Sequence, residues 1–408
     1  MRFNNWTLWL SLFFRGDSAK ILRSTFPRTC FHISITFATL PLYLLGYLIP
    51  KKKDLWIFGN FFGYCDSARY LFEYVQRNYP EIQAVWIHFN AGDAPPTSRS
   101  HCFRFSLSGL IAQYRAGLVF LSTGKGDVAR FTLAGKTVIQ LWHGIPIKRI
   151  LLDSASSVLF GGKDTLLGDI ARNILRNDLN RYALIIASSA TVQQRLCSAF
   201  GIDVDRIAIT GYPRHDIILS FSGQTERCIL YAPTWRENLQ DAETIVRQIC
   251  NPLFVQKLKK LGFSLQVSIH PLNHTIGSSL RRELGNDITF VAENDDVNIV
   301  LARSEVLITD YSSVAIDFSI LNRPLIFFAP DLDAYLSSRG VYPEFESIIR
   351  QNAVTTPDSI FSILQQPDIK PVIDEKIYFQ WHDSLSRKRI VALVQDRFLN
   401  QNSVNAQQ

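Results

Sequence analysis

The stretch "LITDYSSVAIDF", residues 307–318, contains the pattern on which the prediction of the fold rests. A short apolar run breaks at Thr309 or Asp310, and a helix is expected to begin around Ser312 and Ser313. A buried strand that turns at once into a helix is typical of a parallel α/β sheet. The stretch therefore predicts that this chain is built from strand–helix units.

The same unit recurs on both sides of this stretch. The apolar runs that predict strands lie at 54–60, 82–89, 117–124, 136–144, 181–190, 227–236, 263–271, 305–313 and 324–330. Helical spacing marks 66–80, with Asp66 and Ser67 as candidate N-caps, and 191–201. Strands alternating with helices across two stretches predict an α/β fold with two parallel-sheet domains.

The boundary between the two domains is expected near "ITGYPRHDI", residues 209–217, which reads as a turn. The predicted organisation is an N-terminal segment 1–53, a first domain 54–212, a second domain 213–365, and a C-terminal helix and tail 366–408. The tail is polar and is expected to be helical near 383–399.

The composition narrows the class of protein. Hydrophobic residues make up 47% of the 408 residues and charged residues 19%, which excludes a disordered chain and a multi-span membrane protein. The net charge of +7 suits anionic partners. No cysteine pair has C-x-x-C spacing, which argues against a zinc knuckle and a disulfide scaffold and fits a reducing cytoplasm. No nucleic-acid-binding signature is present, so no nucleic-acid partner is predicted.

The N-terminal segment contains a nineteen-residue apolar run at 31–49, followed by Pro50 and three lysines at 51–53. Such a run fits a marginal transmembrane helix. It also fits an in-plane anchor with cations on lipid head groups, or a buried helical hairpin of the first domain. We favour membrane association, and the choice between spanning and lying in the membrane stays open. A cleaved signal peptide is not expected, because the charged stretch before the run is too long.

Polar residues follow several of the predicted strands, where ligands collect in open α/β sheets. The four sets are Trp142-His143-Gly144, Pro233-Thr234-Trp235-Arg236, Ser268-Ile269-His270-Pro271 and Thr309-Asp310-Tyr311-Ser312-Ser313. Loops at this edge of a sheet often carry functional residues. We therefore expect the functional site here.

Ser312 and Ser313 could form a phosphate site, because their hydroxyls would lie beside unpaired N–H groups at a helix N-terminus. Asp317 lies one helical turn further on and could accept hydrogen bonds from a sugar or polyol. The alternative, given equal weight, is that the serines only cap the helix and Asp317 is a solvated acid.

His143 and His270 follow predicted strands of different domains, so they could face each other across a cleft. One could then act as a general base while the other binds developing phosphate charge. A single histidine at a strand end is more often structural. Arg214 and Arg236 add donors for phosphate oxygens. No pattern for a metal ion is found, Asp331 and Asp333 are interpreted as loop acids, and a metal-independent mechanism is expected.

Six segments occur together in one order: "QLWHGIPIKRI", "GYPRHD", "YAPTWRE", "SIHP", "LITDYSSVAIDF" and "PLIFFAPDLDAY". Over about residues 54 to 365 the sequence resembles the CDP-glycerol glycerophosphotransferase family, which includes teichoic acid primases and polymerases and capsule enzymes. The resemblance implies a glycosyltransferase-B-like architecture, in which two Rossmann-like domains face a cleft. It implies transfer of glycerol phosphate from CDP-glycerol to a hydroxyl, with release of CMP and without a cofactor or metal.

The resemblance also assigns roles to residues. His143 would be the base on the acceptor hydroxyl, and His270 would contact the pyrophosphate. Substrate contacts would fall on Trp142, Gly144, Ile145, Pro146, Arg214, Pro233, Thr234, Ser268, Ile269, Ser312, Ser313 and Asp317, with Arg236 added for its donors. Ile145 and His215 depart from the family's usual residues, which bears on polyol and acceptor specificity.

The predicted protein is a bacterial enzyme on the cytoplasmic face of the cell membrane, acting on a lipid-linked or polymer acceptor. The first domain would be the acceptor side and the second would bind the CDP-polyol. CDP-ribitol is an equal rival as donor. A UDP-sugar transferase or epimerase, and a catalytically silent binding protein, are further alternatives. Lys148 and Arg149 stay unassigned, with an anionic acceptor or lipid favoured over the donor as their partner. The segment 151–178 is a candidate for meeting the bilayer or the acceptor, and it could equally be an ordinary surface helix pair. The oligomeric state stays open.

Overall fold

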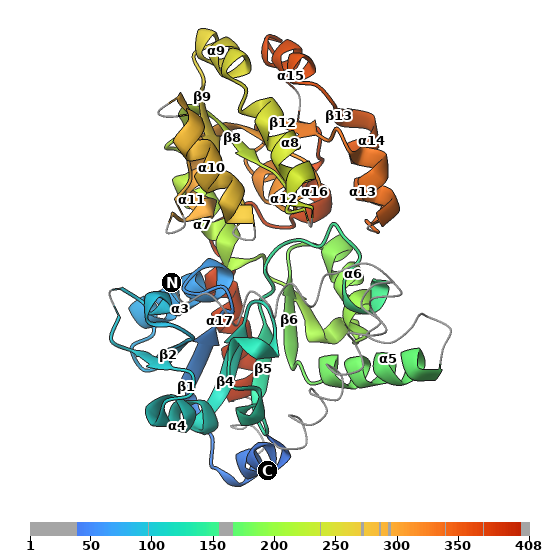
Figure 1. Ribbon diagram of the computed structural model, residues 1–408. Helices are drawn as coiled ribbons and strands as arrows, with labels where there is room; N and C mark the ends of the chain where they lie inside the picture. Colours follow the sequence, from blue (N-terminus) through green and yellow to red (C-terminus); the bar gives the residue numbers. More distant parts are fainter. Residues whose placement is uncertain are drawn as a thin grey trace.

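The computed structural model describes residues 39–154 and 166–400, apart from positions 97, 237, 271–272, 285–286, 293–294, 339 and 370. It contains two all-parallel sheets, one in each of two lobes stacked end to end (Figure 1). Lobe 1 is the part built on the seven-stranded sheet, and lobe 2 is the part built on the six-stranded sheet. The predicted α/β fold with parallel sheets is therefore confirmed.

The lobe 1 sheet has the order β3-β2-β1-β4-β5-β6-β7. Its strands are β3 (His101–Phe103), β2 (Gln83–His88), β1 (Lys52–Gly59), β4 (Ala116–Leu121), β5 (Thr137–Gln140), β6 (Leu184–Ala187) and β7 (Ile207–Ile209). In register, Leu121 at the end of β4 pairs with Gln140 at the end of β5. The loops that follow β4 and β5 therefore leave the sheet side by side.

The lobe 2 sheet has the order β10-β9-β8-β11-β12-β13. Its strands are β10 (Thr289–Phe290), β9 (Ser264–Val267), β8 (Glu226–Ala232), β11 (Ser304–Thr309), β12 (Leu325–Phe328) and β13 (Ala353–Val354). In each sheet the first strand along the chain, β1 or β8, lies in the interior, and later strands are added first on one side of it and then on the other. This doubly wound arrangement leaves a crevice at the carboxyl ends of the strands. Thr309 pairs with Ala232, and Tyr231 pairs with Val267, so three of the predicted polar strand ends lie together.

Helices connect the strands. In lobe 1 they are α3 (Asp66–Asn78), α4 (Leu107–Arg115), α5 (Leu166–Leu179) and α6 (Ala190–Phe200), and α7 (Pro213–Phe221) leads into lobe 2. In lobe 2 they are α8 (Leu239–Ile249), α9 (Pro252–Lys260), α10 (His274–Leu284), α11 (Val297–Arg303), α12 (Val314–Ser319), α13 (Leu332–Ser338), α14 (Pro343–Asn352) and α15 (Pro357–Leu364). Two more, α16 (Glu375–Tyr378) and α17 (Ser386–Val394), follow.

The apolar core runs through both lobes. Alternating residues of β8 point to opposite faces: Leu230 joins the cluster that continues into lobe 1, while Ile229 and Tyr231 join a second cluster on the outer face. This alternation is the period-2 pattern of a strand covered on both faces. Because one apolar cluster reaches from lobe 1 into lobe 2, the lobes share part of their core.

The C-terminal segment returns to lobe 1. Helix α17 lies beside α3 and α7 in the lower lobe (Figure 1). The buried carboxylate of Asp216, on α7, accepts hydrogen bonds from the backbone N–H groups of Ser386 at 2.9 Å and Arg387 at 3.0 Å. An acid at the first turn of a helix satisfies donors that would otherwise be unpaired. Asp216 thereby ties α17 to the connection between the lobes.

The longer predicted strands are confirmed, while four short ones, β3, β7, β10 and β13, were missed because two to three residues show no periodicity. The residues 136–144 were predicted as one strand, but β5 ends at Gln140. Trp142 takes a left-handed backbone conformation with φ 59°, which an extended strand does not allow.

The N-terminal prediction is only partly covered. Residues 39–48 form a helix whose leucines Leu40, Leu42, Leu44, Leu45 and Leu48 are exposed, while 31–38 lie outside the described residues. Within the described residues, no helix has the length and apolar character needed to span a bilayer. Of the segment 151–178, positions 155–165 lie outside the described residues, as do 401–408 of the tail.

Candidate functional site

The loop after β5 places His143 at the boundary of the lobes. The buried side chain of Gln140 accepts a hydrogen bond from the backbone N–H of Trp142 at 3.0 Å, which supports the left-handed turn. The Trp142 ring is 8% exposed and packs edge-on against Phe200, with 5.3 Å between ring centroids. A non-glycine residue at positive φ is strained, and such residues cluster at functional sites. The packed indole thus holds the turn that presents His143.

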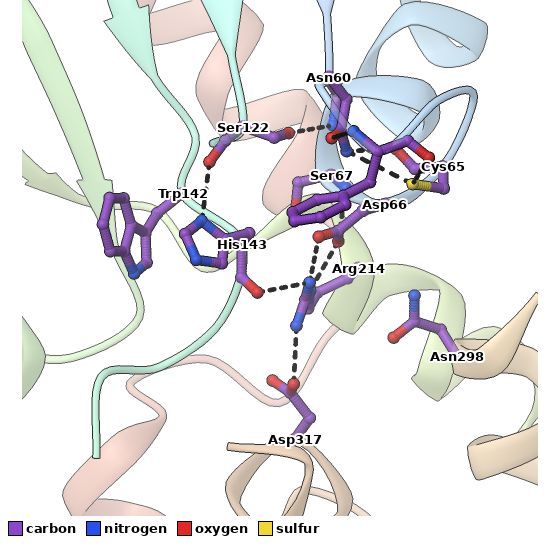
Figure 2. A network of polar contacts seen from close by, with 12 residues as sticks. Asn60, Cys65, Asp66, Ser67, Ser122, Trp142, His143, Arg214, Asn298 and Asp317 are labelled. Atoms are coloured by element: carbon purple, nitrogen blue, oxygen red, sulfur yellow. Dashed lines mark hydrogen bonds and ion pairs between the residues drawn. The ribbon is translucent and has the colours of Figure 1, made fainter. Parts of the chain in front are cut away.

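The His143 ring is exposed, and its Nδ1 lies 3.2 Å from the carbonyl oxygen of Ser122 (Figure 2). A carbonyl oxygen can only accept, so Nδ1 carries the proton and Nε2 is left with its lone pair. Desolvation by the surrounding protein is the largest influence on this group and lowers the pKa of His143 below its ordinary value. His143 is therefore neutral at pH 7, with Nε2 as its basic nitrogen.

The loop after β4 supplies that carbonyl and is itself held by Asp127. This buried carboxylate accepts hydrogen bonds from the N–H groups of Ser122 at 2.9 Å, Thr123 at 2.8 Å and Phe61 at 3.1 Å. Desolvation raises the pKa of Asp127 to about 6, although these donors act in the opposite direction. Asp127 joins the loops after β1 and β4, so it contributes to the position of the Ser122 carbonyl.

Arg214, at the start of α7, lies at the centre of a buried ion network between the lobes (Figure 2). It donates to Asp66 of lobe 1 through Nε at 2.8 Å and also through Nη2. Its Nη1 donates to Asp317 of α12 at 2.8 Å, and Nη2 donates to the carbonyl oxygen of His143 at 2.9 Å. His215 Nε2 lies 3.0 Å from the other oxygen of Asp317. We call Asp66, Arg214, His215 and Asp317 the clamp network.

Two members of the clamp network, Arg214 and Asp317, were predicted from the sequence as substrate contacts, but their polar groups bind other groups of the chain. Asp317 is 2% exposed, and both of its oxygens already have partners within the chain. Burial alone would raise the pKa of Asp317, but Arg214 and His215 outweigh it and hold that pKa below its ordinary value. Four hydrogen bonds from Arg214 likewise go to groups of the chain. The geometry therefore places Arg214 and Asp317 as residues that position His143 and the two lobes.

Ser313 lies against the loop that carries His143. Gly144 has φ 149°, and a Cβ at this position would lie 3.0 Å from the Ser313 hydroxyl, so glycine permits the close approach of the two lobes. Ser313 is the N-cap residue of α12 but makes no side-chain cap bond, whereas Ser312 Oγ accepts from the N–H of Val314 at 3.4 Å. The Ser313 hydroxyl thus lies beside the His143 loop, at the interface of the lobes.

The second group of predicted residues lies in lobe 2. A hollow beyond the ends of β8 and β9 is lined by Pro233, Thr234, Arg236, Ile269 and His270, together with Asn273 and the apolar residues Ala242, Val246 and Ile276. The His270 ring is exposed. The surrounding protein and then the charge of Lys148 lower its pKa to about 4, so this ring is neutral at pH 7. Ser268 is half-buried and donates its N–H to Tyr231 at 2.9 Å.

Arg236, which lines this hollow, is the centre of a second buried ion network. Arg236 pairs with Asp310 at 2.9 Å and with Asp331 at 2.8 Å. The Tyr311 hydroxyl donates to Asp331 at 3.1 Å, and the Tyr311 ring stacks on Tyr335 with 3.7 Å between centroids. We call Arg236, Asp310 and Asp331 the wall network. Asp331, interpreted from the sequence as a loop acid, is instead a partner of Arg236.

The structure separates the predicted residues into three groups. His143, Gly144, Arg214, Ser313 and Asp317 meet between the lobes, and Pro233, Thr234, Arg236, Ile269 and His270 line the hollow. Ser312 precedes Ser313 at the start of α12, and Ser268 follows β9 just before Ile269. The side chains of Trp142, Ile145 and Pro146 are buried, with Ile145 only 1% exposed in the core. These three side chains therefore support the loop by packing against the protein interior.

Sequence reasoning missed Asp66, Ser122 and Asp127 as members of the site. Asp66 was read as an N-cap, but Cys65 is the capping residue and Asp66 has φ 62°. Ser122 directly follows the strand at 116–121, a signal that the search of strand ends could have used. Within the described residues, no group of three or more histidine, cysteine or acidic residues is arranged to hold a metal ion.

The chain is similar to known proteins over most of its length. A family model described as CDP-glycerol:poly(glycerophosphate) glycerophosphotransferase matches residues 42–396. Teichoic acid poly(glycerol phosphate) polymerase of Staphylococcus epidermidis is 27% identical over 80% of this chain, which spans about half of that polymerase, 47%. Teichoic acid poly(ribitol-phosphate) polymerase of Bacillus spizizenii is 26% identical over 60% of this chain and 39% of its own length.

A solved structure is similar over most of the chain. The wall teichoic acid polymerase TagF superimposes with a TM-score of 0.71 at 26% identity, covering 91% of this chain and 97% of that chain. A histidine variant of TagF soaked with CDPG gives a TM-score of 0.67 with the same coverage. The similarity therefore includes both lobes.

Proposed function

The chain belongs to the CDP-glycerol:poly(glycerophosphate) glycerophosphotransferase family, and from that premise we propose that it transfers glycerol phosphate from CDP-glycerol to a hydroxyl of a membrane-linked acceptor. CMP is the second product. The observation that carries the proposal is the state of His143: an exposed, neutral ring whose Nδ1 is committed to Ser122 and whose Nε2 is basic. A positioned base of this kind suits removal of a proton from an attacking hydroxyl.

The proposed step is a direct displacement at the phosphorus that bears the glycerol. The acceptor oxygen forms a new bond to this phosphorus, and the bond from phosphorus to the bridging oxygen breaks. CMP leaves with the electron pair, and His143 Nε2 takes the proton of the acceptor hydroxyl. The clamp network contributes by holding the carbonyl of His143 through Arg214, so the base is oriented before the substrate arrives.

Lobe 2 is the proposed donor side. The hollow lined by Pro233, Thr234, Ile269 and His270 lies at the carboxyl ends of its strands, where nucleotides bind in doubly wound sheets. Because its pKa is about 4, His270 would act on the donor phosphates as a neutral hydrogen-bond donor and not as a cation. The acceptor would then enter from lobe 1, in a glycosyltransferase-B-like arrangement with the reaction between the lobes.

The protein is proposed to work at the cytoplasmic face of a bacterial cell membrane, in synthesis of a teichoic-acid-like or capsular polymer. The exposed leucines of residues 39–48 and the exposed Lys52 and Lys53 next to them support contact with an anionic membrane surface. CDP-ribitol is the alternative donor, supported by the similarity to a poly(ribitol-phosphate) polymerase.

The test is release of CMP by the purified full chain from CDP-glycerol, CDP-ribitol and, for comparison, UDP-sugars, each with a lipid-linked acceptor. We expect CMP from CDP-glycerol and no UDP from a UDP-sugar. If only CDP-ribitol yields CMP, the donor is CDP-ribitol and the proposed type of reaction is kept. The proposal is refuted if neither CDP-polyol yields CMP.

A further inference from the structure

The chain just beyond His143 leaves lobe 1 and attaches to lobe 2. Lys148 forms an antiparallel bridge with Val341. On either side of it, the carbonyl of Ile147 accepts from the N–H of Tyr342 at 2.9 Å, and Arg149 donates its N–H to Gly340 at 3.0 Å. These backbone contacts fix the loop on lobe 2, so the side chain of Lys148 projects from a well-defined place.

The amine of Lys148 lies over an aromatic ring of lobe 2. Its Nζ is 5.4 Å from the centroid of the Tyr335 ring, which stacks on Tyr311. Tyr311 in turn contacts Asp331 of the wall network. The positive charge of Lys148 also lowers the pKa of His270, which lines the hollow. A residue of lobe 1 therefore brings a cation to the tyrosine pair of lobe 2 that contacts the wall network, and its charge acts on His270 of the hollow.

The ion networks near the hollow carry net negative charge, so a cation is needed there to attract the phosphates of a donor. Arg236 lines the hollow, but it is paired with both Asp310 and Asp331, so the wall network carries a formal charge of −1 when both acids are ionised. Arg214 is paired with Asp66 and Asp317 in the same way. A nucleoside diphosphate donor is itself anionic. Without a further cation, these two networks would repel its phosphates.

We propose that Lys148 binds the phosphates of the nucleotide donor, completing from lobe 1 a donor site that is otherwise formed by lobe 2. This inference rests on the proposed function and extends it to a residue expected from the sequence to meet acceptor or lipid. Lysine provides three N–H donors and a compact positive charge, which suits phosphate oxygens. Because Lys148 is five residues from His143 in the same loop, donor binding would also bear on the loop that carries the base.

The competing explanation is that Lys148 only joins the lobes through Tyr335. Binding of CMP and of cytidine separates the two, because CMP has a phosphate and cytidine does not. The full chain, its Lys148→Met and Lys148→Arg variants, and an Arg149→Met control would be titrated with each ligand by calorimetry. Arg149 is the matched control, since it is the adjacent cation on the same loop and its side chain is exposed.

We expect Lys148→Met to weaken CMP binding by about tenfold to a hundredfold, the usual range for a lost hydrogen bond to a charged group. Cytidine binding should not change, Lys148→Arg should keep part of the CMP affinity, and Arg149→Met should match the wild type. Equal loss of CMP and cytidine binding, or no loss of either in Lys148→Met, overturns the inference.

The outcomes also separate this inference from the proposed function. If the wild type binds CMP through Lys148 but releases no CMP from either CDP-polyol, the reaction is refuted and the phosphate contact stands. If turnover is present and Lys148→Met turns over with an unchanged KM for the donor, only the role of Lys148 is refuted. A second readout, the NMR titration of His270, should show a higher pKa in Lys148→Met than in Arg149→Met. An unchanged titration would contradict the placement of Lys148.

Discussion

The clamp network and the wall network have almost the same composition but different positions. Each centres on one buried arginine that pairs with two aspartates. The clamp network joins Asp66 of lobe 1 to Asp317 of lobe 2, and Arg214 also holds the carbonyl of His143. The wall network lies within lobe 2, and its Arg236 lines the hollow. Similar side chains therefore lie beside His143, the proposed base, in one place and beside the proposed donor hollow in the other.

An arginine at the end of a strand or the start of a helix therefore does not by itself indicate a ligand-binding residue. A buried arginine must find partners within the protein, because an unpaired buried charge is costly. Arg214 and Arg236 each form ion pairs with two aspartates, so their positive charges are largely cancelled. The cation that contributes most to donor binding is then expected elsewhere, on the loop that carries Lys148.

The largest expected effect is on His143, the proposed base, whose carbonyl accepts a hydrogen bond from Arg214 of the clamp network. His143→Ala should lower the rate of transfer by about 10²–10⁴-fold, the contribution of a positioned general base. The binding of CMP should change little, because the hollow is in lobe 2. Single-turnover release of CMP measures the rate, and calorimetry measures the binding. A variant that turns over at nearly the wild-type rate would show that His143 is not the base.

The next effect is on stability. Arg214→Met should lower the free energy of unfolding by about 3–5 kcal/mol, because Asp66 and Asp317 would remain buried without their partner. Arg247→Met is the matched control: Arg247 also pairs with two acids, Glu243 and Glu283, but on the exposed face of α8, so the loss there should be at most about 1 kcal/mol. Urea denaturation measures both. Equal losses would show that the clamp network does not join the lobes.

The pH dependence tests the environment of His143. The ring acts as a base only when neutral, and desolvation lowers its pKa below 6.5. As the pH falls from 8, kcat/KM should therefore stay level past 6.5 and decline only at lower pH, by about tenfold for each further unit. A profile of kcat/KM over pH 5 to 8 measures this. A decline that begins above 6.5 would indicate that a different group, or a more solvated histidine, is the base.

The smallest expected effect concerns the wall network. Burial raises the pKa of Asp331, but Arg236 and Tyr311 outweigh it, so the net pKa is lowered and the acid is ionised at pH 7. Asp331→Asn removes one negative charge beside the hollow and should tighten CMP binding by about twofold to fivefold, opposite in sign to Lys148→Met. Asp333→Asn is the control, because Asp333 is exposed and pairs with Arg350. Weaker CMP binding in Asp331→Asn would contradict the charge argument.

Much of the fold could be predicted because its signals are local. The apolar runs that form β1, β2, β4, β8 and β11 are long enough to be identified as buried strands. Gly or Pro lies at or just after the end of some of them, such as Gly59 in β1 and Pro233 after β8. The search of strand ends also found His143, Thr234 and His270. It could not tell which polar residues face the cleft: Arg214 and Asp317 looked like ligand contacts, but their partners lie about 150 and 100 positions away in the chain.

By itself, the sequence determined the alternation of strands and helices, the doubling of the parallel-sheet pattern, and the polar residues at the strand ends. These follow from periodicity and turn chemistry over a few residues. The folded structure was needed to show which charges cancel one another, which nitrogen of His143 is basic, and that Lys148 of lobe 1 lies over the Tyr335 ring of lobe 2. Such properties depend on burial and on distances between segments far apart in the chain, because a charge is felt fully only where water is excluded.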